Sequence, residues 1–236
     1  MTPAQVLSLF SPLDAVAVCL LGAAWVGTTL WIENGRARRV SVSILMEGYR
    51  REWLQAYVTR TPRVFDMIAL SNLRQGTAFF ASSCLIGLGG GLALIANPET
   101  IASLAADLAI EQAPVLVWEI KTLLLLLLMA NALFKFIWAH RLFGYCAVVM
   151  SAAPNDEGVL AYHHAQQAAE IANSAARSFN RGLRAVYFAV GAAAWLAGPW
   201  VLMASTILTV AVLWRREFNS KSREILLRKP PQGASE

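Results

Sequence analysis

Three polar residues in one apolar stretch are the first candidates for chemistry: Glu119, Lys121 and Asn131. Thr122 is followed by an unbroken run of leucines, so the stretch reads as a membrane span. An ionised group inside a bilayer costs about 2.5–3.5 kcal/mol and is therefore a functional hypothesis by default. Glu119 and Lys121 are two residues apart, so on a helix they point to opposite faces and cannot pair with each other. We therefore expect each to require a partner from another helix, a water-filled cavity or a route to the interface, and Glu119 is the strongest candidate.

Sites for metals, haem or nucleophilic catalysis have no support in the sequence. His163 and His164 are adjacent, and with Glu170 they lack the i, i+4 spacing of a zinc-binding helix. The cysteines are isolated and lie in apolar surroundings: Cys19, Cys84 and Cys146. No acid–base or nucleophile constellation stands out among the few polar residues. We expect no metal, no cofactor and no enzymatic activity.

A second group of charged residues flanks the apolar stretches and is placed to meet lipid headgroups. Its members are Arg60, Arg63, Asp66, Arg184, Arg215 and Arg216. The cluster of Arg60, Arg63 and Asp66 fits either a phosphate site or a solvated charged turn. The net charge of +5 gathers beside apolar runs, as the positive-inside rule describes, so nucleic acid is not an expected partner.

Composition decides the fold class. Of 236 residues, 57% are hydrophobic and 15% are charged, whereas soluble domains carry about 25% charged residues. These values predict an all-α, polytopic transmembrane helix bundle in one domain, residues 1–223, with four to five membrane-inserted helices and a flexible basic tail, residues 224–236. The expected spans are residues 13–32, 76–96, 114–138, 184–198 and 199–214. Cytoplasmic amphipathic helices are expected at residues 40–60 and 157–180.

Small residues recur every four positions in the second span, at Ser83, Gly87 and Gly91. Such a ribbon lets another membrane helix approach closely. A gating hinge at the neighbouring glycines is the alternative interpretation.

Residues 185–214 are uncharged and are broken near the middle by Gly198 and Pro199. Lys and Arg number eight in residues 33–74, none in 97–113, four in 141–184 and six from Arg215 onward. With the N-terminus outside, all four counts obey the positive-inside rule only if the chain turns at Gly198–Pro199 and returns. We therefore expect a helical hairpin and a cytoplasmic tail in a bacterial inner membrane; a single kinked span is the alternative.

Several motifs carry a resemblance to a known family. They are Arg60…Arg63…Asp66, Phe79-Phe80-Ala81-Ser82, Glu119-x-Lys121, Phe134-Lys135-Phe136-x-Trp138-x-x-Arg141, Asn180-Arg-Gly-Leu-Arg-Ala-x-Tyr-Phe and Arg215-Arg-Glu-Phe. The chain resembles the DUF599 family, which comprises uncharacterised multi-span membrane proteins of bacteria and plants, from about residue 5 to 223. The family commonly has a His before the Pro-Trp, where this sequence has Gly198, so an activity that required that His would not carry over. The resemblance implies a shared architecture and supplies no reaction.

Three classes of function remain open. A small oligomeric transport or channel-type protein for an ion or small solute is the first, because charged residues and a broken helix pair are ingredients of a polar pathway. A non-enzymatic accessory or assembly subunit of a larger membrane complex is the alternative, and a lipid-acting enzyme is the third. The expected partners are the bilayer, anionic lipid headgroups, and a second copy or another membrane protein. A transporter predicts that Glu119 lines a hydrated cavity, whereas an accessory subunit predicts internally paired polar groups.

Overall fold

The computed structural model describes residues 5–6, 8–35, 39–97, 100, 103 and 114–228, and every regular element within them is a helix. The elements are α2 (Pro12–Ile32), α3 (Val42–Thr59), α4 (Val64–Ile95), α6 (Val115–Ala152), α7 (Val159–Ala193), the 3-10 helix η1 (Ala194–Ala197), α8 (Pro199–Phe218) and α9 (Lys221–Leu226). Three of them, α2, α4 and α6, are long and apolar enough to cross a membrane. The predicted all-α fold is confirmed for the described residues, and its three apolar helices are compatible with a membrane protein.

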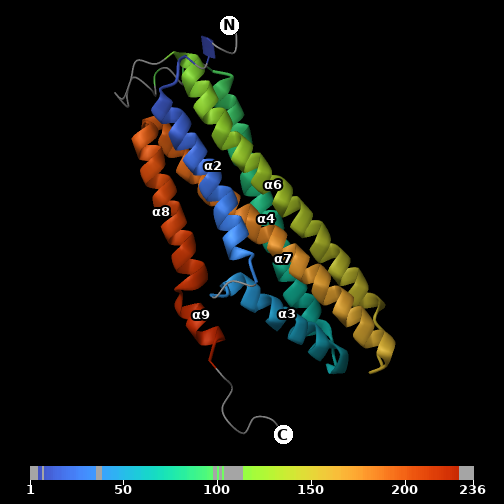
Figure 1. The fold of residues 1–236 in the computed structure, drawn as a ribbon. Coiled ribbons are helices and arrows are strands. Elements are labelled where there is room, and N and C mark those ends of the chain that lie inside the picture. Colours follow the sequence, from blue (N-terminus) through green and yellow to red (C-terminus); the bar gives the residue numbers. More distant parts are fainter. Residues whose placement is uncertain are drawn as a thin grey trace.

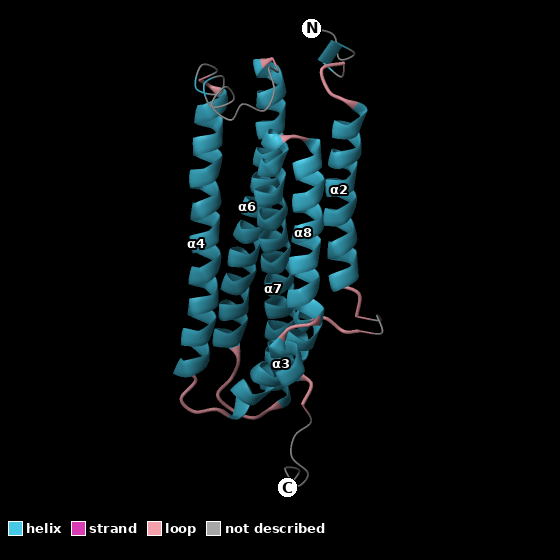
Figure 2. Cartoon of the chain, turned by 90° about the vertical axis from the view of Figure 1, so that its left-hand side faces the viewer, coloured by secondary structure: helices cyan, strands magenta, loops and turns pink. Residues whose placement is uncertain are grey.

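The long helices run side by side as a bundle, and α3 lies across one end of it (Figures 1 and 2). In this bundle α6 packs against both α4 and α7, while α7 also contacts α2, α3 and α8. Helix α8 lies beside α2. Because α7 contacts most of the other helices, side chains that α7 carries can connect parts of the chain that are far apart in sequence.

Helix α2 begins as its sequence predicts. Ser11 caps it, Pro12 occupies the first turn, and Asp14 completes a capping box by accepting a hydrogen bond from the backbone N–H of Ser11 at 3.0 Å. Its 21 residues span about 32 Å, close to the ~30 Å hydrocarbon core of a bilayer. A helix of this length that crosses a bilayer ends at its interfaces, so the end of α2 at Ile32 is the expected depth of one membrane interface.

Two helices extend well beyond their expected spans. α4 begins at Val64 and α6 ends at Ala152, where spans 76–96 and 114–138 were expected. Hydropathy marks the part of a helix that suits lipid, but a helix continues until a capping or breaking residue ends it. The additional turns of α4 and α6 pack with α3 and α7 in a core of their own.

The expected peripheral helix 157–180 and the expected span 184–198 are one continuous helix, α7. That boundary was placed wrongly, at the polar residues Asn180 and Arg181, which the sequence suggests should be solvated. In the structure these side chains are paired with other helices, and Gly182 fits under the ring of Phe136. No feature of the chain between Asn180 and Arg184 ends the helix.

The chain does turn at Gly198 and Pro199. Gly198 has φ 111°, a conformation that favours glycine, and Pro199 opens α8 at a position where its missing N–H costs nothing. α8 then runs back along α7 and α2 (Figure 1). Of the four to five membrane-inserted helices expected, three have the length and composition of spans among the described residues; insertion of the α7–α8 pair stays a prediction.

The small-residue ribbon of α4 is divided between two faces. Gly87 and Gly91 lie against α6, where an added Cβ would meet the side chains of Met129 and Leu126. Ser83 is exposed and donates to the carbonyl of Phe79 in its own helix, while neighbouring Cys84 is buried. Most of the acidic loop 97–113 and the end of the tail lie outside the described residues, and the start of that tail is helical in α9.

Candidate functional site

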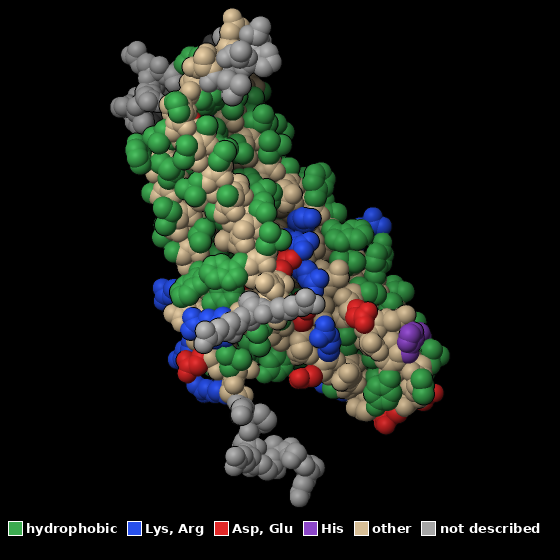
Figure 3. Space-filling view, in the orientation of Figure 1, with side chains coloured by type: hydrophobic (Ala, Val, Ile, Leu, Met, Phe, Trp, Pro, Cys, Tyr) green, Lys and Arg blue, Asp and Glu red, His purple; other side chains and the backbone are tan. Residues whose placement is uncertain are grey.

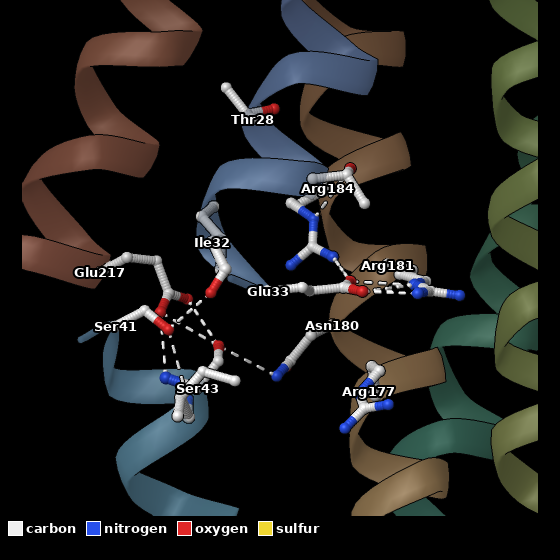
Figure 4. Close-up of polar contacts among 12 residues, drawn as sticks. Thr28, Ile32, Glu33, Ser41, Ser43, Arg177, Asn180, Arg181, Arg184 and Glu217 are labelled. Atoms are coloured by element: carbon white, nitrogen blue, oxygen red, sulfur yellow. Dashed lines mark hydrogen bonds and ion pairs between the residues drawn. The ribbon is translucent and has the colours of Figure 1, made fainter. Parts of the chain in front are cut away.

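A carboxylate held by two guanidinium groups stands where α2 ends. Glu33 follows α2 directly, and α7 presents Arg181 and Arg184 to it (Figure 4). Arg181 donates through Nε to Glu33 Oε1 at 2.9 Å, and Arg184 donates through Nη2 to the same oxygen. Arg181 and Arg184 are three residues apart on one helix, so both reach the same side of α7. The spacing of the two arginines therefore builds a receptor for one carboxylate.

Next to Glu33, a second carboxylate connects α3 with α8. Ser43, in the first turn of α3, donates its backbone N–H to Glu217 Oε2 at 3.1 Å and its hydroxyl to Glu217 Oε1 at 3.0 Å. Asn180 of α7 donates to the Ser43 hydroxyl at 3.3 Å. A carboxylate at a helix N-terminus meets unpaired N–H groups and the positive end of the helix dipole. Glu217 thus fixes the start of α3 from α8.

We call Glu33, Ser43, Asn180, Arg181, Arg184 and Glu217 the Glu33 hub. It links α2, α3, α7 and α8 in one network of charged and polar side chains (Figure 4). A second pair, Arg177 with Glu47 at 2.8 Å, continues the contact between α7 and α3. The arrangement can hold four helices in register, since Glu33 forms ion pairs with Arg181 and Arg184 and Glu217 accepts hydrogen bonds from Ser43.

The electrostatics of the hub favour the ionised carboxylate. Burial opposes ionisation of Glu33, but the hydrogen bond from Arg181 and the charges of Arg184 and Arg181 outweigh it and hold the pKa of Glu33 below its ordinary value of 4.5. The Arg184 side chain is only 4% exposed. Removing one member of such a buried pair leaves the other charge without compensation, which destabilises the fold strongly.

The structure separates the three predicted intramembrane polar residues. Lys121 is 5% exposed, and its Nζ lies 5.4 Å from the ring of Trp118 and 5.7 Å from that of Trp195. The Trp195 indole N–H in turn donates to Asp14 Oδ1 at 2.7 Å. Lys121 is therefore enclosed by aromatic rings near an acidic group, at the end of the bundle opposite the hub.

Glu119 is half-buried and makes no hydrogen bond or ion pair with the residues that the structure describes. It lines neither the pocket between α2, α6 and α7 nor the one between α3 and α7. Asn131 lies elsewhere on α6 and lines the first of these pockets. Glu119, Lys121 and Asn131 thus belong to three different environments.

The pocket that contains Asn131 has a volume of about 200 Å³. It is lined by Trp25, Val26, Thr29 and Leu30 of α2, Asn131 and Lys135 of α6, and Arg181 of α7. We call it the α2–α6 pocket. Arg181 belongs to both the pocket and the Glu33 hub, so the two share a wall.

Most of the residues predicted to contact lipid headgroups instead make contacts within the protein. Asp66 is fully buried and accepts from the Trp53 indole at 2.7 Å and from Arg60, so it is not part of a solvated turn. Arg63 donates to the carbonyl of Pro154 at 2.8 Å and lies over the ring of Tyr57. These contacts tie the α3–α4 turn to the segment after α6.

The remaining headgroup candidates lie at the end of α8 or inside the hub. Arg215 is exposed, Arg216 donates to the Tyr187 hydroxyl, and Arg184 is buried against Glu33. Arg215 and Arg216 therefore keep the exposure that a headgroup contact requires, and the Arg60 side chain is 37% exposed beside the buried Asp66.

Of the six hub residues, sequence reasoning named only Arg184 as a site candidate, while Asn180, Arg181 and Glu217 appeared only within the family motifs. Glu33 and Ser43 were missed entirely. The available signals were weak, since Glu33 is one acidic residue directly after an apolar span and Glu217 follows two arginines. Within the described residues no group of three or more His, Cys, Asp or Glu side chains could hold a metal ion.

Residues 16–222 match a family model described as "Protein of unknown function, DUF599", and the chain belongs to that family. No curated protein and no solved structure matches the chain. Two of the motifs that carried the resemblance, the one from Asn180 to Phe188 and the one from Arg215 to Phe218, contribute four of the six hub residues.

Proposed function

We propose that this protein is a non-enzymatic accessory or assembly subunit of a larger complex in the bacterial inner membrane. The observation that carries the proposal is that charged groups have partners inside the chain: Glu33 is paired with Arg181 and Arg184, and Asp14 accepts hydrogen bonds from Ser11 and Trp195. A buried ion pair that joins several helices acts as a structural joint, because its charges are already neutralised by each other. By fixing α2, α3, α7 and α8 relative to one another, the Glu33 hub would give the protein a defined surface for a partner to bind.

A transport or channel-type role is the second candidate and has less support. Such a role predicts a hydrated cavity around Glu119, and neither the α2–α6 pocket nor the pocket between α3 and α7 contains that residue. An enzymatic role on lipid has the least support, since the charges of the hub are engaged with one another. The proposed orientation keeps the N-terminus outside and the hub on the cytoplasmic side, where Lys and Arg are most numerous.

The outward face of α4 is the surface that best suits a partner helix. Only 6% of the apolar window of α4 is buried within the chain, against 22% in α2 and 33% in α6. This face carries Gly89 and Gly90, whose Cβ positions meet nothing within 4 Å, beside Ile86. Small residues allow membrane helices to approach closely, so a helix of another protein or of a second copy can pack there.

Photo-crosslinking from α4 in native membranes tests the proposal. A photoreactive amino acid replaces Ile86, and the matched control replaces Val190 of α7; the native side chains are 77% and 71% exposed. We expect a discrete protein adduct from position 86 and only lipid adducts from position 190. Adducts with lipid alone at position 86 would count against an accessory role, and the mass of a protein adduct would distinguish a second copy from another subunit.

A further inference from the structure

The α2–α6 pocket has a polar end and an apolar end along the direction of the helices. Arg181 and Lys135 lie near the depth at which α2 ends, whereas Trp25 lies about 10 Å further along α2, toward the middle of the bundle. Since α2 is as long as the hydrocarbon core is thick, its end marks the headgroup region. The pocket therefore runs from headgroup depth into hydrocarbon.

The rim of the pocket faces outward. Leu30 is 68% exposed and Val26 is 54% exposed, so the α2 wall continues onto the surface that surrounding lipid covers. Lys and Arg side chains gather at mid-height on one face of the molecule, directly below a predominantly apolar surface (Figure 3). A molecule in the bilayer could enter this pocket sideways without crossing water.

Two polar groups in the pocket have no partner among the residues described. Neither the Asn131 carboxamide nor the Lys135 ammonium makes a hydrogen bond or ion pair there; only the Lys135 backbone carbonyl is engaged, by Ser178. They are one helical turn apart on the same side of α6. Polar groups left unpaired at membrane depth are costly, so a ligand that accepts hydrogen bonds from both would be stabilised.

The charge balance favours an anion. Lys135, Arg181 and Arg184 supply three cations, while Glu33 and the more distant Glu217 supply two carboxylates, which leaves one positive charge. The Glu33 carboxylate is shared between two guanidinium groups, so it does not neutralise Lys135. Guanidinium and ammonium groups are the usual partners of phosphate oxygens in proteins.

The size of the pocket fits a headgroup rather than a whole lipid. A volume of 200 Å³ equals that of about seven water molecules. This is room for a phosphate and the first atoms attached to it, with acyl chains left on the outer surface of α2. The indole of Trp25 can line the boundary between the two, as tryptophan does at membrane interfaces.

From these features we propose that the α2–α6 pocket binds the phosphate headgroup of an anionic phospholipid, from the leaflet at the α3 end of the bundle. Lys135, Arg181 and Asn131 contact the phosphate, and the α2 wall contacts the start of the acyl chains. The site differs from the headgroup positions expected from sequence, and it does not depend on the accessory role proposed above.

Native mass spectrometry of the purified full chain, delipidated and titrated with phosphatidylglycerol or phosphatidylcholine, tests the proposal. The test variants are Lys135→Gln, which removes the pocket cation that has no partner among the described residues, and Val26→Trp, which fills the apolar end and leaves Lys135 and Arg181 in place. The matched control is Lys221→Gln, at an exposed lysine of α9 that does not line the pocket. We expect both test variants to bind phosphatidylglycerol about tenfold more weakly. Lys135→Gln removes one charge-assisted hydrogen bond to the phosphate, and Val26→Trp blocks the entry of the headgroup into the pocket. Phosphatidylcholine binding and the Lys221→Gln variant should show no change.

Each other outcome overturns the proposal. An equal loss in Lys221→Gln would mean diffuse attraction to basic residues rather than a site. Unchanged phosphatidylglycerol binding in Val26→Trp would mean that the lipid binds outside the pocket. This conclusion would hold even if Lys135→Gln bound less lipid because it was less stable. Displacement of phosphatidylglycerol by glycerol phosphate at equal concentration would identify a site for a free anion instead of a lipid.

Discussion

At the scale of single residues, the Glu33 carboxylate shows how burial and pairing compete. Taking a carboxylate out of water favours its neutral form, and the two guanidinium groups of Arg181 and Arg184 more than reverse that preference. Glu119 shows the opposite case, a carboxyl that is half-buried and has no partner in the described part of the chain. The carboxylate that matters most to this structure is therefore Glu33, which lies just after a predicted span, and not Glu119, which lies inside one.

Glu33→Gln should destabilise the protein by roughly 1–3 kcal/mol near neutral pH, because it removes the charge that compensates two arginines. The folded-state pKa of Glu33 lies below 4.5, so its contribution is fully present above 4.5 and is lost as the pH falls through the lower value. Thermal unfolding in detergent should therefore show a clear gap in Tm between wild type and variant at about pH 7, and the gap should narrow as the pH falls below 4.5.

The matched control for this prediction is Glu47→Gln. Its partner Arg177 is 45% exposed, so the pair is screened by water and should contribute less. Equal losses in the two variants, or a gap that persists at low pH, would mean that the Glu33 hub is not the joint described above.

At the scale of helices, the continuity of α7 depends on contacts that are distant in sequence. Glu33 and Arg181 are 148 residues apart, so no local pattern indicates that the polar stretch around Asn180 stays helical. The break at Gly198 and Pro199 is local, because glycine tolerates its positive φ and proline suits the first turn of a helix. For this reason the turn could be predicted from the sequence, while the junction at residues 180–184 could not.

Close packing between α6 and α7 rests on Gly182. An added Cβ there would lie 2.7 Å from the ring of Phe136, which is fully buried and packs with Phe80 and Phe179. Gly182→Ala should therefore destabilise the protein by about 1–3 kcal/mol through overpacking. Gly76→Ala in α4, where nothing lies within 4 Å, should be neutral or slightly stabilising, since alanine favours helix over glycine.

Chemical denaturation of the two alanine variants in the same detergent measures this difference. If Gly182→Ala were as stable as Gly76→Ala, the α6–α7 packing would be looser than described.

At the scale of the whole molecule, polar groups gather at the two ends of an apolar bundle. The Glu33 hub and α3 occupy one end, and Asp14, Lys121 and Trp195 the other. Composition alone predicts the all-α membrane fold, since so low a charged fraction leaves few alternatives. Which charges meet could not be predicted, because pairing depends on how helices are placed around α7, and a sequence without that arrangement shows only isolated residues.

An ion-flux assay on the reconstituted protein tests most directly whether the charged residues stabilise the fold or form a transport pathway. The wild-type chain and Glu119→Gln would be placed in liposomes, and proton and potassium movement would be followed with entrapped dyes. We expect both proteins to leave the leak at the level of protein-free liposomes, since the hub charges are already paired. A flux that rises with the amount of wild-type protein and disappears in Glu119→Gln would contradict the accessory role and establish a transport pathway.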